Sequence, residues 1–355
     1  MNILNKHKVI RNIISNQRFL QLKYISMAID TVFDKNRKED RYSHSIQVAN
    51  ACEIMNDCIS EKVGFLTDYK NTSYIVGLLH DIGHTAGGHE GERILDKMIS
   101  EYSNGELFYD SNANNYVVIE RENVLEDCED IEYILASLAK HPDRLYDDQK
   151  YIKGYIERSI KEDIEYLNIN GLLTIDMKKT LQCQIMDIAD ENCYTISDIL
   201  DARNIYNNYM LAKFIRKEVD KKFANKLISS LYKSKKHFED YLQEIFLMFC
   251  DNYTLKNGSL EVTDKDIELL RQSLLSINKK YVLNNKKIKK VRNKISTEIK
   301  IVFKALLSEE IEFPSKSYKN EIKKASSEKE KNILKRNMLG SFTDKAIKKI
   351  TKRIK

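Results

Sequence analysis

Only two prolines, Pro142 and Pro314, and eleven glycines interrupt the 355 residues of this chain. Glycine and proline form most of the turns between short strands, so their shortage argues against an all-β fold. Apolar residues recur instead at helical spacing along almost the whole sequence, for example at Ile75, Leu78 and Leu79. We therefore expect an all-α protein, long enough to bury a substantial core as one large domain or as a domain with an appendage.

Two segments depart from this helical pattern. Residues 103–115 (SNGELFYDSNANN) could form a short hairpin, and YVVIE at residues 116–120 has the composition of a strand. Nothing else in the sequence indicates a sheet. Residues 321–355 have weaker periodicity and more charge, which leaves a C-terminal helix pair and a partly ordered tail both open.

Charge is unevenly distributed along the chain. Residues 315–355 contain 14 Lys+Arg and 4 Asp+Glu, a net charge of +10, although the whole chain has a net charge of only +6. A basic tail on a slightly acidic body suggests contact with a polyanion, whether nucleic acid, nucleotide or another subunit. A solvated, lysine-rich helix face is an equally good explanation.

The remaining composition indicates a cytoplasmic protein. No stretch approaches the roughly 20 apolar residues of a membrane span, and the first residues contain no apolar core of signal-peptide length. The six cysteines are scattered without a CxxC pair, as in a protein with reduced, mostly buried thiols. We expect no membrane contact.

The densest group of chemically active side chains lies in GLLHDIGHTAGGHEGE, residues 77–92, which holds three of the seven histidines. His80 and Asp81 directly follow an apolar helical run, where burial of an imidazole and a carboxylate without partners is costly. A divalent metal ion is a suitable partner because it accepts neutral imidazole nitrogen and carboxylate oxygen together. Two ligands do not make a site, so others should come from different helices.

Two candidates lie far away in the sequence. His44 stands upstream in RYSHS, and Asp190 stands downstream in MDIADENCYTISDILD. Helical spacing places five polar residues on one stripe of the downstream helix: Asp187, Asp190, Tyr194, Asp198 and Asp201. Such a stripe either faces solvent or lines an ion-binding cavity, and the sequence leaves both open.

The order of His44, His80-Asp81 and Asp190 resembles the HD-domain superfamily of helical, metal-dependent phosphohydrolases. More narrowly, RYSHS, HDIGHxxxGHxGE and ADxxxYxxxD resemble the deoxynucleoside triphosphate (dNTP) triphosphohydrolases of the dGTPase-like branch. The resemblance covers less than half of the chain. It implies an HD-domain helical bundle with a C-terminal helical extension. The expected parts are an N-terminal helical segment (1–40), the phosphohydrolase core (41–205) and a basic C-terminal helical region (206–355) that completes the pocket and forms oligomer contacts.

The resemblance also implies roles for individual residues. One divalent ion (Mn, Mg or Fe, otherwise Zn, Co or Ni) would be held by four ligands: His44, His80, Asp81 and Asp190. The implied catalytic residues are His84, His89 and Glu92, where His89 and Glu92 form a dyad that activates water. Arg41 is expected to contact substrate phosphate, since a guanidinium offers several donors in a fixed fork. Tyr194 and Asp198 match positions near the sugar.

The implied reaction is attack on the α-phosphorus of dGTP or several dNTPs, releasing deoxynucleoside and inorganic triphosphate. The metal neutralises phosphate charge and a histidine transfers the proton. Two alternatives stay open: another HD-domain nucleotide phosphohydrolase, such as a nucleotidase or phosphodiesterase, and a nucleic-acid-binding protein with a vestigial HD site. A homo-oligomer and binding of single-stranded nucleic acid are also implied. Residues 279–300, with nine Lys+Arg and one Glu, could contact phosphate or form only a charged helix face.

The sequence departs from the family pattern in three places. Thr85-Ala86-Gly87-Gly88 replaces a proline-phenylalanine pair, from which we expect a more mobile loop. Ser111 stands where many relatives have a histidine before asparagine, and Glu191 replaces an aspartate. His141, in LAKHPD, is expected at a helix end, where a histidine commonly interacts with the final carbonyls.

Overall fold

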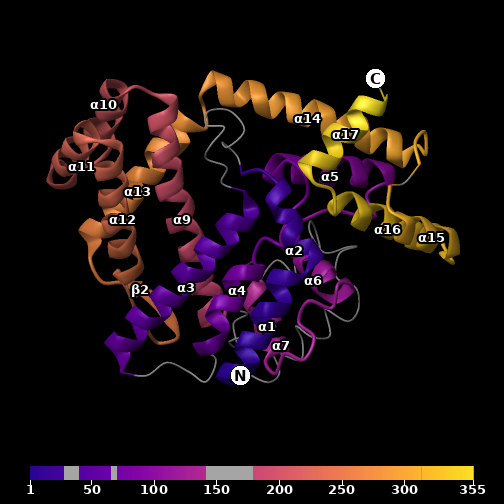
Figure 1. Ribbon diagram of the computed structural model, residues 1–355, viewed down its shortest axis with the longest axis horizontal. Helices are drawn as coiled ribbons and strands as arrows, with labels where there is room; N and C mark the ends of the chain where they lie inside the picture. The colour runs from indigo at the N-terminus through magenta and orange to yellow at the C-terminus, as the bar shows by residue number, and fades with distance from the viewer. Residues whose placement is uncertain (28–39, 65–69, 141–178, 313, 355) are drawn as a thin grey trace.

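The computed structural model describes residues 1–27, 40–64, 70–140, 179–312 and 314–354 (Figure 1). The prediction of an all-α protein is confirmed, because helices make up most of the described residues. They are α1 (Ile3–Ser15), α2 (Gln17–Gln21), α3 (Arg41–Val63), α4 (Ser73–Leu79), α5 (Gly88–Tyr102), α6 (Ser111–Arg121), α7 (Ile131–Leu138), α9 (Leu181–Ile205), α10 (Asn208–Glu218), α11 (Lys221–Lys233), α12 (Lys235–Asp251), α13 (Lys265–Ile277), α14 (Lys286–Leu307), α15 (Lys316–Lys324), α16 (Glu328–Gly340) and α17 (Asp344–Ile354). Short helical turns are η1 (Leu22–Tyr24), η2 (Lys70–Thr72) and η4 (Asn278–Val282).

The predicted hairpin and strand at residues 103–120 were wrong. YVVIE lies inside α6, whose first turn is capped by the Asp110 side chain accepting from the N–H groups of Asn112 and Ala113. Val118 and Ile119 are buried in the core. A run of β-branched residues has only a weak preference for strand, and burial of this helix face outweighs it.

A small hairpin lies elsewhere, at residues for which no sheet was expected. Strands β1 (Tyr253–Lys256) and β2 (Ser259–Val262) pair antiparallel, with Lys256 opposite Ser259. The two linking residues, Asn257 and Gly258, both have positive φ, at 51° and 77°. Asn-Gly is the preferred sequence for such a two-residue turn, so the signal was present and missed.

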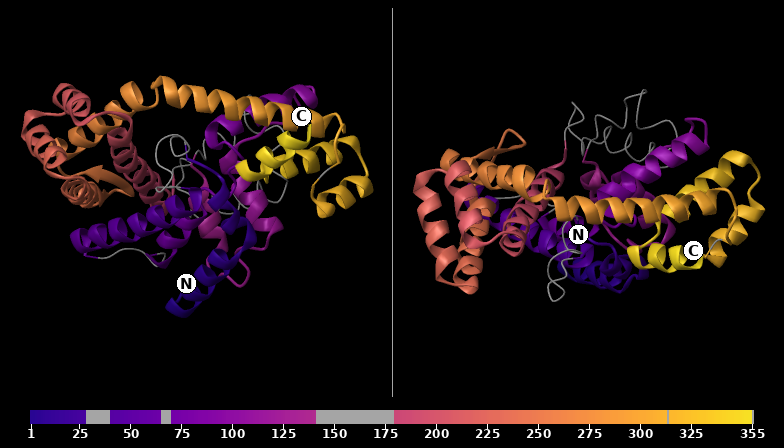
Figure 2. Two further views of the ribbon diagram at one scale, coloured as in Figure 1. Left: turned by 45° about the horizontal axis from the view of Figure 1, so that its top comes forward. Right: turned by 90° about the horizontal axis from the view of Figure 1, so that it is seen from above.

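Buried apolar side chains form three clusters. The first joins α1, α3, α4, α7 and the N-terminal half of α9; the second joins the C-terminal half of α9 to α10–α13. The third is built from α5, α14 and the last three helices, α15–α17. Figure 1 shows α10–α13 and α15–α17 on opposite sides of the molecule, with α14 running between them, and Figure 2 shows the same span from above. The basic C-terminal residues are therefore helical, and α5 packs with them.

The close approach of α3 and α4 depends on one glycine. A Cβ added at Gly77 would lie 2.6 Å from the Cα of Ala49 and 2.9 Å from its nitrogen. Real Cβ atoms do not approach backbone this closely, so only glycine allows the two helices to pack at this distance. Because His80 follows three residues after Gly77, this contact brings the end of α4 toward the start of α3.

Two further observations concern the chain as a whole. Among the described residues, no helix is both long and apolar enough to cross a membrane. All six cysteines lie in the described part of the chain and none forms a disulfide.

Candidate functional site

The start of α3 positions the first two predicted site residues. Asp40 caps the helix through a hydrogen bond from the Ser43 N–H to its side chain, and Ser43 in turn accepts from the Asp40 N–H. This capping box fixes the first turn of the helix. Arg41 and His44 therefore occupy defined positions in that turn, and both are buried.

The end of α4 positions His80 and fixes its tautomer. Nδ1 of His80 lies 2.7 Å from the carbonyl oxygen of Gly77. A carbonyl only accepts, so Nδ1 carries the proton and Nε2 presents a lone pair. Burial lowers the pKa of His80, although Asp81 and Asp190 partly offset this. The ring is therefore neutral, as a metal ligand must be.

The middle of α9 brings Asp190 to the same place. Its Oδ1 lies 2.9 Å from Nε2 of His44 and 3.7 Å from Nε2 of His80. Its Oδ2 accepts a hydrogen bond of 2.9 Å from Nζ of Lys140. Burial alone would raise the pKa of Asp190, but Lys140 and His44 hold it well below its usual range. The carboxylate is therefore ionised.

The donor set fits one divalent metal ion. Nε2 of His80 is buried and has no hydrogen-bond partner among the described residues, yet it lies 3.6 Å from Oδ1 of Asp81 and 3.7 Å from Oδ1 of Asp190. A nitrogen lone pair facing two carboxylate oxygens is unfavourable unless a cation lies between them. Ligand atoms about 2.0–2.2 Å from one ion stand roughly 3–4 Å apart, which matches these separations. The described residues His44, His80 and Asp81 could hold such an ion with ligand atoms within 4.8 Å of one another, and Asp190 adjoins both histidines.

The predicted catalytic residues form a second group beside the first. Nδ1 of His89 lies 3.2 Å from Oε2 of Glu92, and the rings of His84 and His89 meet edge to face at 5.1 Å. Oε1 of Glu92 accepts from the Ser111 N–H at 2.9 Å. His84 links the two groups, since its Nδ1 lies 3.2 Å from Oδ1 of Asp81. The predicted dyad of His89 and Glu92 is therefore present as a geometric pair.

Electrostatics assign different charge states to the members of this second group. Burial and the charge of Arg41 lower the pKa of His84 to about 3, so this ring is neutral near pH 7. Burial opposes ionisation of Glu92, but the His89 hydrogen bond, His84 and the Ser111 N–H lower its pKa to about 2. His89 is 81% exposed at its side chain and is therefore the member that faces solvent.

Arg41 reaches both groups. Its Nη1 donates to Oδ2 of Asp81, and its Nη2 lies so near Gly88 that a Cβ there would be 2.8 Å away. Burial alone would raise the pKa of Asp81. Arg41, together with His84, His80 and His44, instead holds it well below its usual range. The guanidinium thus stands between a predicted metal ligand and the start of α5.

The glycine loop is held more firmly than its sequence suggests. Thr85 and Ala86 are fully buried, and the Thr85 hydroxyl donates to the Leu339 carbonyl at 3.1 Å. The N–H of Gly87 donates to Oδ1 of Asp344 at 2.7 Å. The expectation of a mobile loop finds no support in this packing, because residues from the C-terminal helices contact the loop.

The predicted sugar-contacting residues lie further along α9 and make other contacts. The hydroxyl of Tyr194 donates to Glu191 at 3.0 Å, and Asp198 accepts from the side chain of Asn278. Glu191 also pairs with Arg271 of α13. All five residues of the predicted α9 stripe are half-buried, so this stripe does not face open solvent.

Three residues near the site were missed in the sequence. Lys140 binds Asp190, and Asn115 holds the turn after α4 by accepting from the Gly83 N–H at 2.7 Å and donating to the His80 carbonyl at 2.8 Å. Buried Arg18 donates to the carbonyls of His84 and Gly340, at 2.9 and 3.1 Å. Such contacts join distant segments and leave no spacing pattern. His141 lies outside the described residues.

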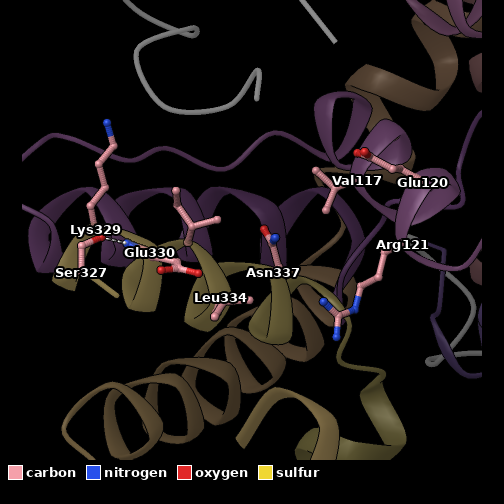
Figure 3. A pocket seen from close by; sticks show the side chains of 9 residues that line it. Val117, Glu120, Arg121, Ser327, Lys329, Glu330, Leu334 and Asn337 are labelled. Carbon is pink, nitrogen blue, oxygen red and sulfur yellow. Dashed lines mark hydrogen bonds between the residues drawn. The ribbon is translucent and has the colours of Figure 1, made fainter. Parts of the chain in front are cut away.

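A cavity of about 540 Å³ lies elsewhere, between α6 and α16 (Figure 3). Its described lining mixes Glu120, Arg121, Lys329 and Glu330 with apolar side chains. None of the predicted site residues is among them. The candidate site is therefore the paired group at α3, α4, α5 and α9.

The comparisons with known proteins agree with this geometry. Residues 41–192 match the model of the HD domain, which confirms the resemblance to that superfamily. Among curated relatives, a deoxyguanosinetriphosphate triphosphohydrolase-like protein 2 of Mesorhizobium japonicum is 27% identical over 189 residues, covering 46% of this chain and 38% of the relative. Deoxyguanosinetriphosphate triphosphohydrolase-like proteins of Rickettsia typhi and Bradyrhizobium diazoefficiens are 21% and 28% identical. The matches cover 78% of this chain and 73% of the Rickettsia protein, and 53% of this chain and 45% of the Bradyrhizobium protein. The chain therefore spans less than half the length of two of these relatives.

Proposed function

We propose that this protein hydrolyses deoxynucleoside triphosphates to deoxynucleoside and inorganic triphosphate with one divalent metal ion, held by His44, His80, Asp81 and Asp190. The observation that carries the proposal is the distance of 3.2 Å between Nδ1 of His84 and Oδ1 of Asp81, which joins the two groups into one site. A metal site alone would suit many phosphohydrolases. A histidine–glutamate pair and an arginine beside it suit attack on a phosphate. The names of the relatives support the substrate class.

The residues divide the chemistry by charge. A metal ion bound at the first group would neutralise phosphate charge and polarise the reacting centre or a bound water. Ionised Glu92 accepts from Nδ1–H of His89, which leaves Nε2 of that exposed ring able to take a proton from the attacking water. Neutral His84 has one N–H, which faces Asp81 when it is on Nδ1 and can donate to a phosphate oxygen or to the leaving 5′-oxygen when it is on Nε2.

Arg41 supplies the fixed positive charge. Its guanidinium is buried against Asp81 and Gly88, and a cation in a poorly hydrated position stabilises phosphate charge more strongly than one in water. Tyr194 and Asp198, one and two turns beyond Asp190 on α9, are the proposed contacts for the sugar. The base that is preferred depends on pocket walls beyond these residues.

A product assay tests this proposal. Pure protein is incubated with each of the four dNTPs and Mn²⁺ or Mg²⁺, and the phosphate products are resolved. We expect inorganic triphosphate and deoxynucleoside, with activity lost on changing both His80 and Asp81 to alanine and retained in His237→Ala, an exposed histidine on α12. Pyrophosphate or orthophosphate would instead identify another HD-domain phosphohydrolase. Activity that survived the double change would overturn the assignment of the metal ligands.

One observation favours a second function, binding of single-stranded nucleic acid. Seven lysines of α14 are exposed: Lys286, Lys287, Lys289, Lys290, Lys294, Lys300 and Lys304. A basic helix face binds a polyanion with a steep dependence on salt, independently of the metal site. Binding of single-stranded DNA that is unchanged by salt or by Lys289→Glu with Lys290→Glu would exclude this use of α14. A homo-oligomer assembled through the C-terminal region is a further part of the proposal, and sedimentation tests it.

A further inference from the structure

We propose that Asp344 is a positioning residue. It holds the second group of the site (His84, His89 and Glu92) in a fixed position relative to Arg41. This inference rests on the proposed function. The carboxylate of Asp344 joins two segments far away in the sequence: Oδ1 accepts from the Gly87 N–H at 2.7 Å, and Oδ2 accepts from the Ser26 N–H at 3.0 Å and from the Ser26 hydroxyl. Asp344 is the first residue of α17, and Thr343 already caps that helix through the Ala346 N–H at 3.2 Å. The carboxylate therefore acts between segments rather than on its own helix.

The first segment is the start of α5, which carries His89 and Glu92. The residue before this helix is Gly87, with φ of 77° and no side chain to cap the helix. The first N–H groups of a helix need acceptors, and a carboxylate there also interacts favourably with the helix dipole. Asp344 supplies the missing acceptor from a distant part of the chain. It thereby fixes where α5 begins.

The second segment leads to Arg41. Ser26 pairs with Asp40 in an isolated antiparallel bridge, and the neighbouring Ile25 carbonyl accepts from the Arg41 N–H at 3.2 Å. Asp40 is the residue that caps α3. A carboxylate bound to Ser26 therefore fixes the strand-like segment that lies against the start of α3.

The two segments meet at Gly88. A Cβ placed there would lie 2.8 Å from Nη2 of Arg41 and 3.5 Å from the Ser26 carbonyl oxygen. With so little space, a small shift of the α5 start changes the distance between the arginine and the His89–Glu92 pair. A displacement of about 1 Å at a reacting centre can reduce the rate about 100-fold.

Two of the four proposed metal ligands are held by other contacts. His80 is fixed by Gly77, and Asp190 by Lys140. Asp81 is reached only indirectly, through Arg41, so loss of the Asp344 carboxylate should reduce turnover more than metal affinity. This split separates a positioning role from a general loss of structure.

The test compares Asp344→Ala and Asp344→Asn with Glu328→Ala, which removes an exposed acid from the first turn of α16. Asparagine keeps an oxygen that can accept from the Gly87 N–H, but its NH₂ group then faces the Ser26 N–H, and both are donors. It loses one of the two contacts, whereas alanine loses both, so asparagine should be the milder change. We expect kcat to fall about 10-fold to 100-fold in the alanine variant and less in the asparagine variant. Mn²⁺ affinity should fall much less than kcat, and hydrogen exchange should be faster only in peptides from residues 84–92 and 22–27. Glu328→Ala should match the unchanged protein.

The outcomes separate the two proposals. Unchanged hydrogen exchange at residues 84–92 in Asp344→Ala, or an equal loss of Mn²⁺ affinity and turnover, would overturn the positioning role. If the unchanged protein releases no triphosphate from any dNTP but the exchange pattern appears as expected, the proposed function fails and the role of Asp344 in holding the loop stands.

Discussion

Lys140 and His44 bind opposite oxygens of one carboxylate. Nζ of Lys140 lies 2.9 Å from Oδ2 of Asp190, and Nε2 of His44 lies 2.9 Å from Oδ1. Lys140 also lies 3.9 Å from Asp187 on the same helix. The positive charge of Lys140 thus offsets negative charge on two carboxylates. Oδ1 of Asp190 is left directed at His44 and His80.

Lys140→Met should therefore destabilise the metal-free protein. The change leaves the Asp190 carboxylate without its lysine and removes one of the two lysines near Asp187, which costs about 1–3 kcal/mol at these exposures of 17–24%. Chemical denaturation in the presence of a chelator measures the loss. Lys179→Met is the matched control because Lys179 pairs with Asp187 but is more exposed and does not bind Asp190. Equal losses in both variants would contradict a special role for Lys140.

Addition of Mn²⁺ to the metal-free protein should raise its stability. An ion that binds only the folded state adds about 2.7 kcal/mol at a concentration 100 times the Kd. His80→Ala removes the lone pair that faces Asp81 and Asp190, so the stabilisation should disappear. Thermal unfolding across an Mn²⁺ titration provides the measurement, with His237→Ala as control. An undiminished shift in His80→Ala would show that this ring is not a ligand.

How much of this site could be predicted depends on how each contact is encoded. His80 and Asp81 are adjacent, and His89 and Glu92 are separated by one helical turn, so spacing alone brought each pair together. The partnership of Lys140 with Asp190, and of Arg18 with the His84 carbonyl, arises from packing between segments 50 and 66 residues apart, which leaves no local pattern.

The errors in the fold have a similar cause. YVVIE looks like a strand because local propensity favours strand, but its burial within α6 decides the outcome. The Thr85–Gly88 loop looked mobile because the residues that hold it, Leu339 and Asp344, lie some 250 residues further along. Tertiary packing therefore decided the α6 helix and provides the contacts of this loop.

Glu92→Gln should change the dependence of stability on pH. The pKa of Glu92 lies at about 2 in the fold against an ordinary 4.5, so the ionised carboxylate stabilises the protein above about pH 4.5. This contribution is lost as the pH falls toward 2, because the unfolded chain then binds the proton first. The variant should be about 1–3 kcal/mol less stable at pH 7, and the difference should shrink toward zero between pH 4.5 and 2.

Denaturant unfolding at several pH values measures that difference. Glu101→Gln serves as the control. Glu101 lies on the same helix, its side chain is 67% exposed, and its ion pair with Lys97 is long, at 3.7 Å. It should show no measurable pH-dependent difference. A constant difference for Glu92→Gln from pH 7 to pH 3 would contradict the depressed pKa.

Gly88→Ala should weaken binding of the triphosphate. Gly88 has φ of 55°, and an added Cβ would lie 2.8 Å from Nη2 of Arg41, whose guanidinium is already held by Asp81. The arginine must move away from its position, so we expect the Kd for inorganic triphosphate to rise about 10-fold, the loss of one charge-assisted contact. Gly258→Ala is a matched control because Gly258 has φ of 77° with nothing within 4 Å of the added Cβ. Both variants carry the left-handed strain of about 1 kcal/mol, so only a difference between them reports on Arg41. Calorimetric titration of both proteins with triphosphate and Mn²⁺ measures it, and equal affinities would show that Arg41 does not contact the phosphate chain.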